Sequence, residues 1–165
     1  MIPTHQQLTD FATTAHALAR EKGWYDSPRT WIELVSLTQG EFHEAIAELR
    51  RAKPPDSPEF LAELADVVIR AMDAITWHGY APTMAPPMAP PMTPPDVARA
   101  RIETAKTLCE RLSLSMSADM RARELSQIAW SCLEWAHANG FPLWEAVLAK
   151  HEVNKARPRK HGKVF

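Results

Sequence analysis

The chain has 165 residues, 45% of them hydrophobic, and a formal net charge of −1, which predicts one compact domain with room for an appendage. Because proteins that neutralise many phosphates are usually basic, this charge balance argues against nucleic acid as the main partner. The start MIPTHQQLTDF does not resemble a secretion signal, no apolar run approaches the roughly 20 residues of a membrane span, and two cysteines make no disulfide framework, so a cytoplasmic protein is expected.

Helical periodicity recurs along the chain and strand signals are nearly absent, so the expected fold is all-α. A first helix is expected over residues 4–21 and a second over residues 30–51. The intervening KGWYDSPR contains Gly23, which suits a helix end, and Pro28, which suits the first turn of the next helix. The prolines of KPPDSP end the second helix, and Ser57 or Asp56 can cap a third that continues to about residue 78.

The segment APTMAPPMAPPMTPPD contains three copies of Met-(Ala/Thr)-Pro-Pro. Such a segment forms neither helix nor ladder, so residues 81–95 are predicted to be an extended linker, with a site for a proline-recognising partner as the alternative. Two helical stretches are expected at about 96–112 and 117–139. A last helix starts near Pro142 and ends before Pro158.

Two acidic pairs flank the break between the second and third helices. Glu41 and Glu44 are three residues apart and share one helix face, and Glu63 and Asp66 do the same on the next helix. Helices joined by so short a break are antiparallel neighbours, so the pairs can face each other. Carboxylates about 6 Å apart repel by roughly 3 kcal/mol per pair at an effective dielectric of 20, which a cation would relieve. Hard anionic oxygen ligands favour Mg²⁺ or Mn²⁺.

Two other interpretations of these carboxylates remain open. They can lie on a solvated helix surface, where Asp66 and Arg70 would form an ordinary i,i+4 ion pair. A di-iron site would require two Glu-x-x-His pairs, and the chain has one, Glu134 with His137, which makes that interpretation weak.

The expected last helix carries Lys150, Asn154 and Arg157 within roughly 40° of one face. Lysine and arginine bind phosphate oxygens, and asparagine can bond a sugar hydroxyl or a phosphate. His161 and Lys163, on the tail, could close over such an anion. The alternative is a solvated basic helix end that the helix dipole favours.

The loop KGWYDSPR offers Trp24, which could stack on a nucleobase, with Asp26 and Arg29 beside it. Trp24 could equally cap the core of the bundle.

These motifs together resemble the MazG-like, all-α nucleoside triphosphate pyrophosphohydrolases of the small phage or bacterial type. The family pattern Glu-x-x-Glu, then Glu-x-x-Asp, is met by GEFHEA and ELADVVIRAMD. KGWYDSPR is similar to the loop before the first motif, and KHEVNKARPRKHGKVF is similar to the family's tail, with one glycine where the family often has two. On this resemblance the whole chain, 1–165, is one MazG-like domain, in which residues 96–139 are an inserted helical region.

The resemblance implies hydrolysis of a nucleoside triphosphate to the monophosphate and pyrophosphate, with a purine deoxynucleotide such as dGTP favoured. It implies that the four carboxylates hold Mg²⁺ or Mn²⁺, that Glu44 or Glu41 accepts a proton from water, and that Lys150 and Arg157 stabilise phosphate charge. Trp24, Arg29, Asn154, His161 and Lys163 would bind the nucleotide. A homodimer or homotetramer in a bacterial or phage-infected cell is expected.

Two further hypotheses belong to other classes. The chain could be a non-catalytic nucleotide sensor or scaffold that keeps the metal site without turnover. It could also be an interaction module built around the Pro-rich segment, in which case deletion of residues 82–95 would abolish its role.

Overall fold

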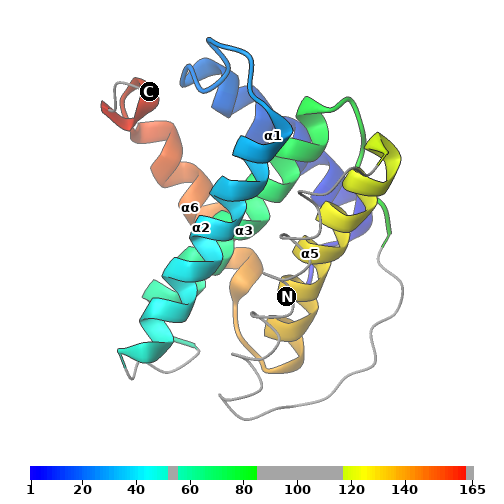
Figure 1. The fold of residues 1–165 in the computed structure, drawn as a ribbon. Helices are drawn as coiled ribbons and strands as arrows, with labels where there is room; N and C mark the ends of the chain where they lie inside the picture. The colour runs from blue at the N-terminus through cyan, green and yellow to red at the C-terminus, as the bar shows by residue number, and fades with distance from the viewer. Residues whose placement is uncertain (52–55, 85–116, 163–165) are drawn as a thin grey trace.

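The computed structural model describes residues 1–51, 56–84 and 117–162 of the chain. Every regular element in these ranges is helical, which confirms the prediction of an all-α bundle (Figure 1). The elements are α1 (His5–Glu21), α2 (Trp31–Arg50), α3 (Pro58–Trp77), α5 (Ala118–Ala138), α6 (Leu143–Ala156) and the short 3₁₀ helix η1 (Arg159–Gly162).

Side-chain caps explain where the first three helices begin. The hydroxyl of Thr4 accepts a hydrogen bond from the backbone N–H of Gln7, and the Gln7 side chain accepts one in return, which is a capping box. Thr30 and Glu33 form the same arrangement at the start of α2. Of the two residues considered for α3, Ser57 is the cap. These helices therefore begin within one residue of their predicted starts.

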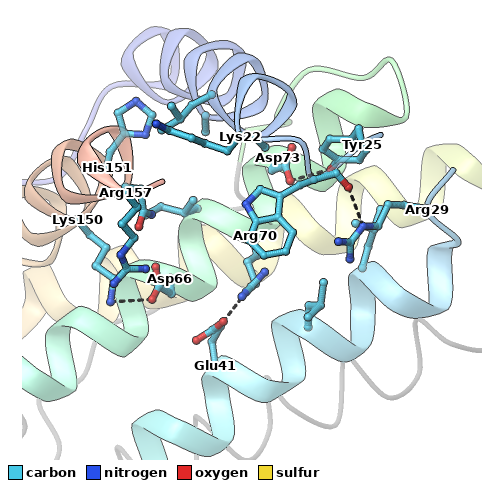
Figure 2. Close-up of a pocket in the computed structure, with 18 of the residues that line it drawn as sticks. Lys22, Tyr25, Arg29, Glu41, Asp66, Arg70, Asp73, Lys150, His151 and Arg157 are labelled. Carbon is cyan, nitrogen blue, oxygen red and sulfur yellow. Dashed lines mark hydrogen bonds and ion pairs between the residues drawn. The ribbon is translucent and has the colours of Figure 1, made fainter. Parts of the chain in front are cut away.

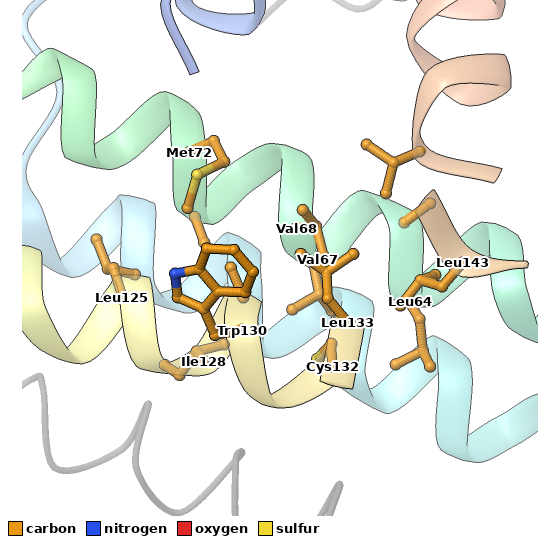
Figure 3. Packing of buried hydrophobic residues seen from close by; sticks show 14 of the residues in the cluster. Leu64, Val67, Val68, Met72, Leu125, Ile128, Trp130, Cys132, Leu133 and Leu143 are labelled. Carbon is orange, nitrogen blue, oxygen red and sulfur yellow. The ribbon is translucent and has the colours of Figure 1, made fainter. Parts of the chain in front are cut away.

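Helix α3 runs through the middle of the bundle, beside α1, α2, α5 and α6 (Figure 1). Its apolar side chains are almost completely buried, and Figure 3 shows Met72 near Trp130 and Val67 near Leu133 of α5, with Leu64 near Leu143 of α6. Burying a side chain of this size contributes about 1.5–3 kcal/mol. The polar residues of α3 therefore lie on the side of this helix that faces α2 and α6.

The residues that follow α3 are held by hydrogen bonds although they form no helix. The carbonyl oxygen of Pro82 accepts a hydrogen bond from the His5 ring, 2.8 Å away. The backbone N–H of Thr83 donates to Ser126, and its carbonyl accepts from the indole of Trp130, both at 3.0 Å. This is the start of the predicted linker, and its remainder, 85–95, lies outside the described residues with the helix predicted at 96–112.

In the described part of the chain, none of the helices combines the length and the apolar character that crossing a membrane requires.

Candidate active site

Three of the four predicted carboxylates come together where α2 lies against α3. One carboxylate oxygen from each of Glu41, Glu44 and Glu63 lies within 4.8 Å of the others, and these three residues are called the carboxylate cluster below. Glu41 is buried, with 7% of its surface exposed, Glu63 is half-buried and Glu44 is exposed. A cluster of this kind could hold a metal ion. Asp66 is the neighbour of the cluster and not one of its members.

Two cations compensate the acidic residues (Figure 2). The Nε of Arg70 donates a hydrogen bond to Glu41 Oε1 at 2.5 Å, and Lys150 Nζ lies 2.8 Å from Asp66 Oδ2. The pairing of Asp66 with Arg70 considered from the sequence is thus replaced by two pairs between helices. Each guanidinium or ammonium group joins α3 to a neighbour, α2 or α6.

The environment of the cluster disfavours its negative charge. Burial raises the pKa of the Glu41 carboxyl above its ordinary value, Arg70 opposes this rise, and the nearby charges of Asp66 and Glu44 add to it. Burial likewise raises the pKa of Glu63, with Lys150 acting in the opposite direction. The fold therefore keeps these carboxylates in a place where a further positive charge would be stabilising.

The cluster opens into a cavity of about 380 Å³ bounded by α1, the α1–α2 loop, α2, α3 and α6. This volume lies in the range of small-molecule sites, roughly 300–1,000 Å³. The predicted site residues that line the cavity are Trp24, Arg29, Glu41, Glu44, Glu63, Asp66, Lys150, Asn154 and Arg157. The fold thus brings residues from four separate parts of the sequence to one cavity.

The α6 wall of the cavity carries two buried polar atoms with no hydrogen-bond partner among the described residues, Nδ1 of His151 and Oδ1 of Asn154. His151 is 6% exposed, and burial lowers the pKa of its imidazole, so the ring is neutral at neutral pH. A buried polar group left without a partner costs about 1–3 kcal/mol. A polar ligand in the cavity could supply the missing hydrogen bonds.

The α1–α2 loop forms the opposite part of the wall. Trp24 is half-buried there, and the guanidinium of Arg29 lies 5.5 Å from the centre of its ring. Arg29 Nε also donates to the carbonyl oxygen of Trp24 at 2.9 Å. The aromatic face and the cation are therefore held together as one unit.

Sequence reasoning missed a second polar group in the cavity wall, centred on Asp73. Its two carboxylate oxygens accept from the Tyr25 hydroxyl and bond the His16 ring, each at 2.7 Å, and the Tyr25 ring stacks on Trp77. Burial and the adjacent Asp73 raise the pKa of the Tyr25 phenol far above its ordinary value, so it remains a hydrogen-bond donor. Asp73 lies seven residues after Asp66 on the same helix stripe, and extending that stripe would have found it.

The tail contacts the α1–α2 loop. Arg159 donates from one nitrogen to both carboxylate oxygens of Asp26, at 2.6 and 2.7 Å, and the Lys160 N–H donates to the Lys22 carbonyl at 2.8 Å. Gly23 has φ +81°, and a β-carbon there would lie 2.6 Å from Arg159 Nε. We call these contacts the loop–tail contact. His161 belongs to η1, and Lys163 lies outside the described residues.

Comparisons with protein-family models, with curated proteins and with solved structures found no match to this chain. The resemblance to the MazG-like family therefore stays a prediction.

Proposed function

We propose that this chain is a metal-dependent nucleoside triphosphate pyrophosphohydrolase, which converts (d)NTP and water to (d)NMP and pyrophosphate. One observation carries the proposal. The carboxylate cluster and the cationic side chains of Lys150 and Arg157 line the same cavity, which also holds an aromatic side chain. Cationic side chains bind the oxygens of a phosphate chain, and carboxylates hold the metal ion to which such a chain also binds.

The donor set of the cluster fits a hard divalent cation. Its ligand atoms are carboxylate oxygens, which suit Mg²⁺ or Mn²⁺ better than zinc or copper. When bound, such an ion would polarise the phosphate chain and lower the pKa of an attacking water. Glu41, Glu44 and Glu63 would hold it, and Asp66 could join them by releasing Lys150.

Glu44 is the better candidate for the base. Glu41 is buried and bonded to Arg70, whereas Glu44 is exposed at the edge of the cluster, where a water can reach it. In the proposed reaction the water oxygen forms a bond to phosphorus, the anhydride bond between the α- and β-phosphates breaks, and pyrophosphate leaves. The proton of the water passes to Glu44.

The remaining cavity residues would bind and orient the nucleotide. Lys150 and Arg157 would stabilise negative charge on the phosphate oxygens. Asn154 Oδ1, which has no hydrogen-bond partner among the described residues, is suited to accept from a sugar hydroxyl. Trp24 could stack on a base, but stacking accepts every base, so the preference for a purine deoxynucleotide rests on the family resemblance alone.

The test is incubation of the chain with each canonical dNTP and NTP, with and without Mg²⁺ or Mn²⁺. We expect at least one triphosphate to give equimolar monophosphate and pyrophosphate, and only with the metal present. Nucleotide binding without pyrophosphate from any substrate would identify a sensor and reject the enzyme. Release of orthophosphate in place of pyrophosphate would place the cleavage at a different bond.

A further inference from the structure

We infer that Arg70 is an internal counter-ion of the carboxylate cluster, which competes with the divalent cation for Glu41 and, once displaced, is available to the substrate's phosphates. The inference rests on the proposed function, because it concerns the same cavity. The spacing of Arg70 in the sequence indicates only an ion pair with Asp66 on the same helix. Its partner became evident only from the bond that it makes across to α2.

The first support is the placement of the guanidinium. Arg70 lies on α3, one turn after Asp66, yet its Nε bonds Glu41 on α2. Asp66 in turn pairs with Lys150 on α6. Two of the four negative charges, those of Glu41 and Asp66, are thus paired directly with cations, whereas Glu44 and Glu63 form no ion pair with any described residue.

The second support is that Glu41 is the buried member of the cluster. Leaving a buried carboxylate without the cation that it pairs with is strongly destabilising, so the pair with Arg70 allows Glu41 to be buried before any metal arrives. A metal ion bound to the cluster brings a second positive group to the same carboxylate. The two repel each other, so each weakens the binding of the other.

The third support is that a displaced Arg70 side chain can move into the cavity. Its side chain is 39% exposed and lines the cavity, as do Lys150 and Arg157. The wall nearby also holds His151, which is nine-tenths buried and has an Nδ1 without a partner in the described ranges, so this cavity is built to take a polar ligand. A guanidinium released from Glu41 would meet phosphate oxygens there and can bond them in bidentate fashion.

The experiment measures binding of Mn²⁺ alone, without nucleotide, by calorimetry or electron paramagnetic resonance. Arg70→Met removes the charge and keeps the length of the side chain. We expect Mn²⁺ to bind this variant about tenfold more tightly than it binds wild type, because the competing charge is gone. We also expect the metal-free variant to melt at a lower temperature and Mn²⁺ to restore most of the loss.

Two further variants make the result specific. Arg123→Met removes an exposed arginine of α5 and should bind Mn²⁺ as wild type does. Arg70→Lys keeps the charge and should also stay close to wild type, and it serves as the second measurement if Arg70→Met does not fold. Unchanged or weaker Mn²⁺ binding by Arg70→Met would overturn the inference, because Arg70 would then support Glu41 as a ligand and not compete for it. Tighter Mn²⁺ binding by Arg70→Lys as well would also contradict it.

The two proposals can fail separately. Unchanged Mn²⁺ binding by Arg70→Met beside an active wild-type enzyme rejects the counter-ion role alone. Tighter binding by the variant beside a wild type that releases no pyrophosphate rejects the enzyme and keeps the counter-ion role. In an active enzyme we further expect Arg70→Met to raise KM for the nucleotide.

Discussion

Glu63 occupies the point where the carboxylate cluster meets α6. It is half-buried. Burial and the neighbouring carboxylates raise the pKa of its carboxyl, and the charge of Lys150 opposes this rise. A change at this residue therefore tests the metal-binding part of the site without disturbing the bond between Arg70 and Glu41.

For Glu63→Gln, which is nearly the same size, we expect the rate of pyrophosphate release to fall by about a hundredfold or more, since a charged ligand oxygen is lost. The melting temperature should hardly change. Glu152→Gln, on the exposed face of α6, is the matched control and should retain the wild-type rate. Wild-type turnover by Glu63→Gln would count heavily against the proposed role of the cluster.

Individual residues were predictable where a single helix determines their relation. The spacing of Glu41 and Glu44, and of Glu63 and Asp66, together with the short break between the helices, predicted that the two pairs can face each other, and in the structure all four line one cavity. The partners of these residues were not predictable in the same way. Whether Arg70 bonds its own helix or the next depends on how α2 and α3 are rotated against each other, and the local sequence does not contain that information.

At the scale of elements, the loop–tail contact joins two segments that are both close to the cavity. Asp26 and Arg159 hold the end of the chain against the loop that carries Trp24 and Arg29. Arg159, which donates the hydrogen bonds, holds the pKa of Asp26 below its ordinary value. The contact therefore stabilises the fold at pH values above the ordinary pKa of an aspartate. This stabilisation is lost as the pH falls through the lowered pKa of Asp26.

We expect Asp26→Arg and Arg159→Asp each to raise KM for the nucleotide by roughly threefold, because an exposed ion pair has a small effect. The double variant exchanges the two charges and should recover most of the loss. Steady-state kinetics near neutral pH provide the measurement. A double variant that is no better than the single ones would show that the pair does not position the loop.

The boundaries of the helices could be predicted closely, because Thr4, Thr30 and Ser57 are caps whose action is local. The contact between the loop and the tail could not. Asp26 and Arg159 are 133 residues apart in the sequence, and each looks like an ordinary surface residue until the bundle is assembled.

At the scale of the whole molecule, α3 serves the core and the site at once. Its apolar stripe packs against α5 and its neighbours, while its polar stripe carries Glu63, Asp66, Arg70 and Asp73. The all-α class and the order of the helices followed from periodicity and helix-breaking residues. Which helix would lie at the centre was not predicted: α2 and α3 both have 20 residues, and the structure shows that α3 buries more apolar side chains than α2.

For Leu64→Ala we expect a loss of about 2–4 kcal/mol in the free energy of unfolding, because Leu64 is 1% exposed in the centre of the bundle. Leu148→Ala is the control, since this side chain is 44% exposed on α6 and should cost much less. Urea unfolding at equilibrium gives both values. Equal losses for the two variants would mean that α3 does not have the central place described above.

Gly23 has a consequence for the way such a chain can diverge. Its backbone conformation disfavours any other residue, and a β-carbon there would overlap the Arg159 side chain. A replacement at this position is therefore strained by the backbone, and the Arg159 side chain also has to move away from it. In homologous chains we expect Gly23 and Arg159 to be retained together or lost together. The chains that retain both would be those in which the tail rests on the loop.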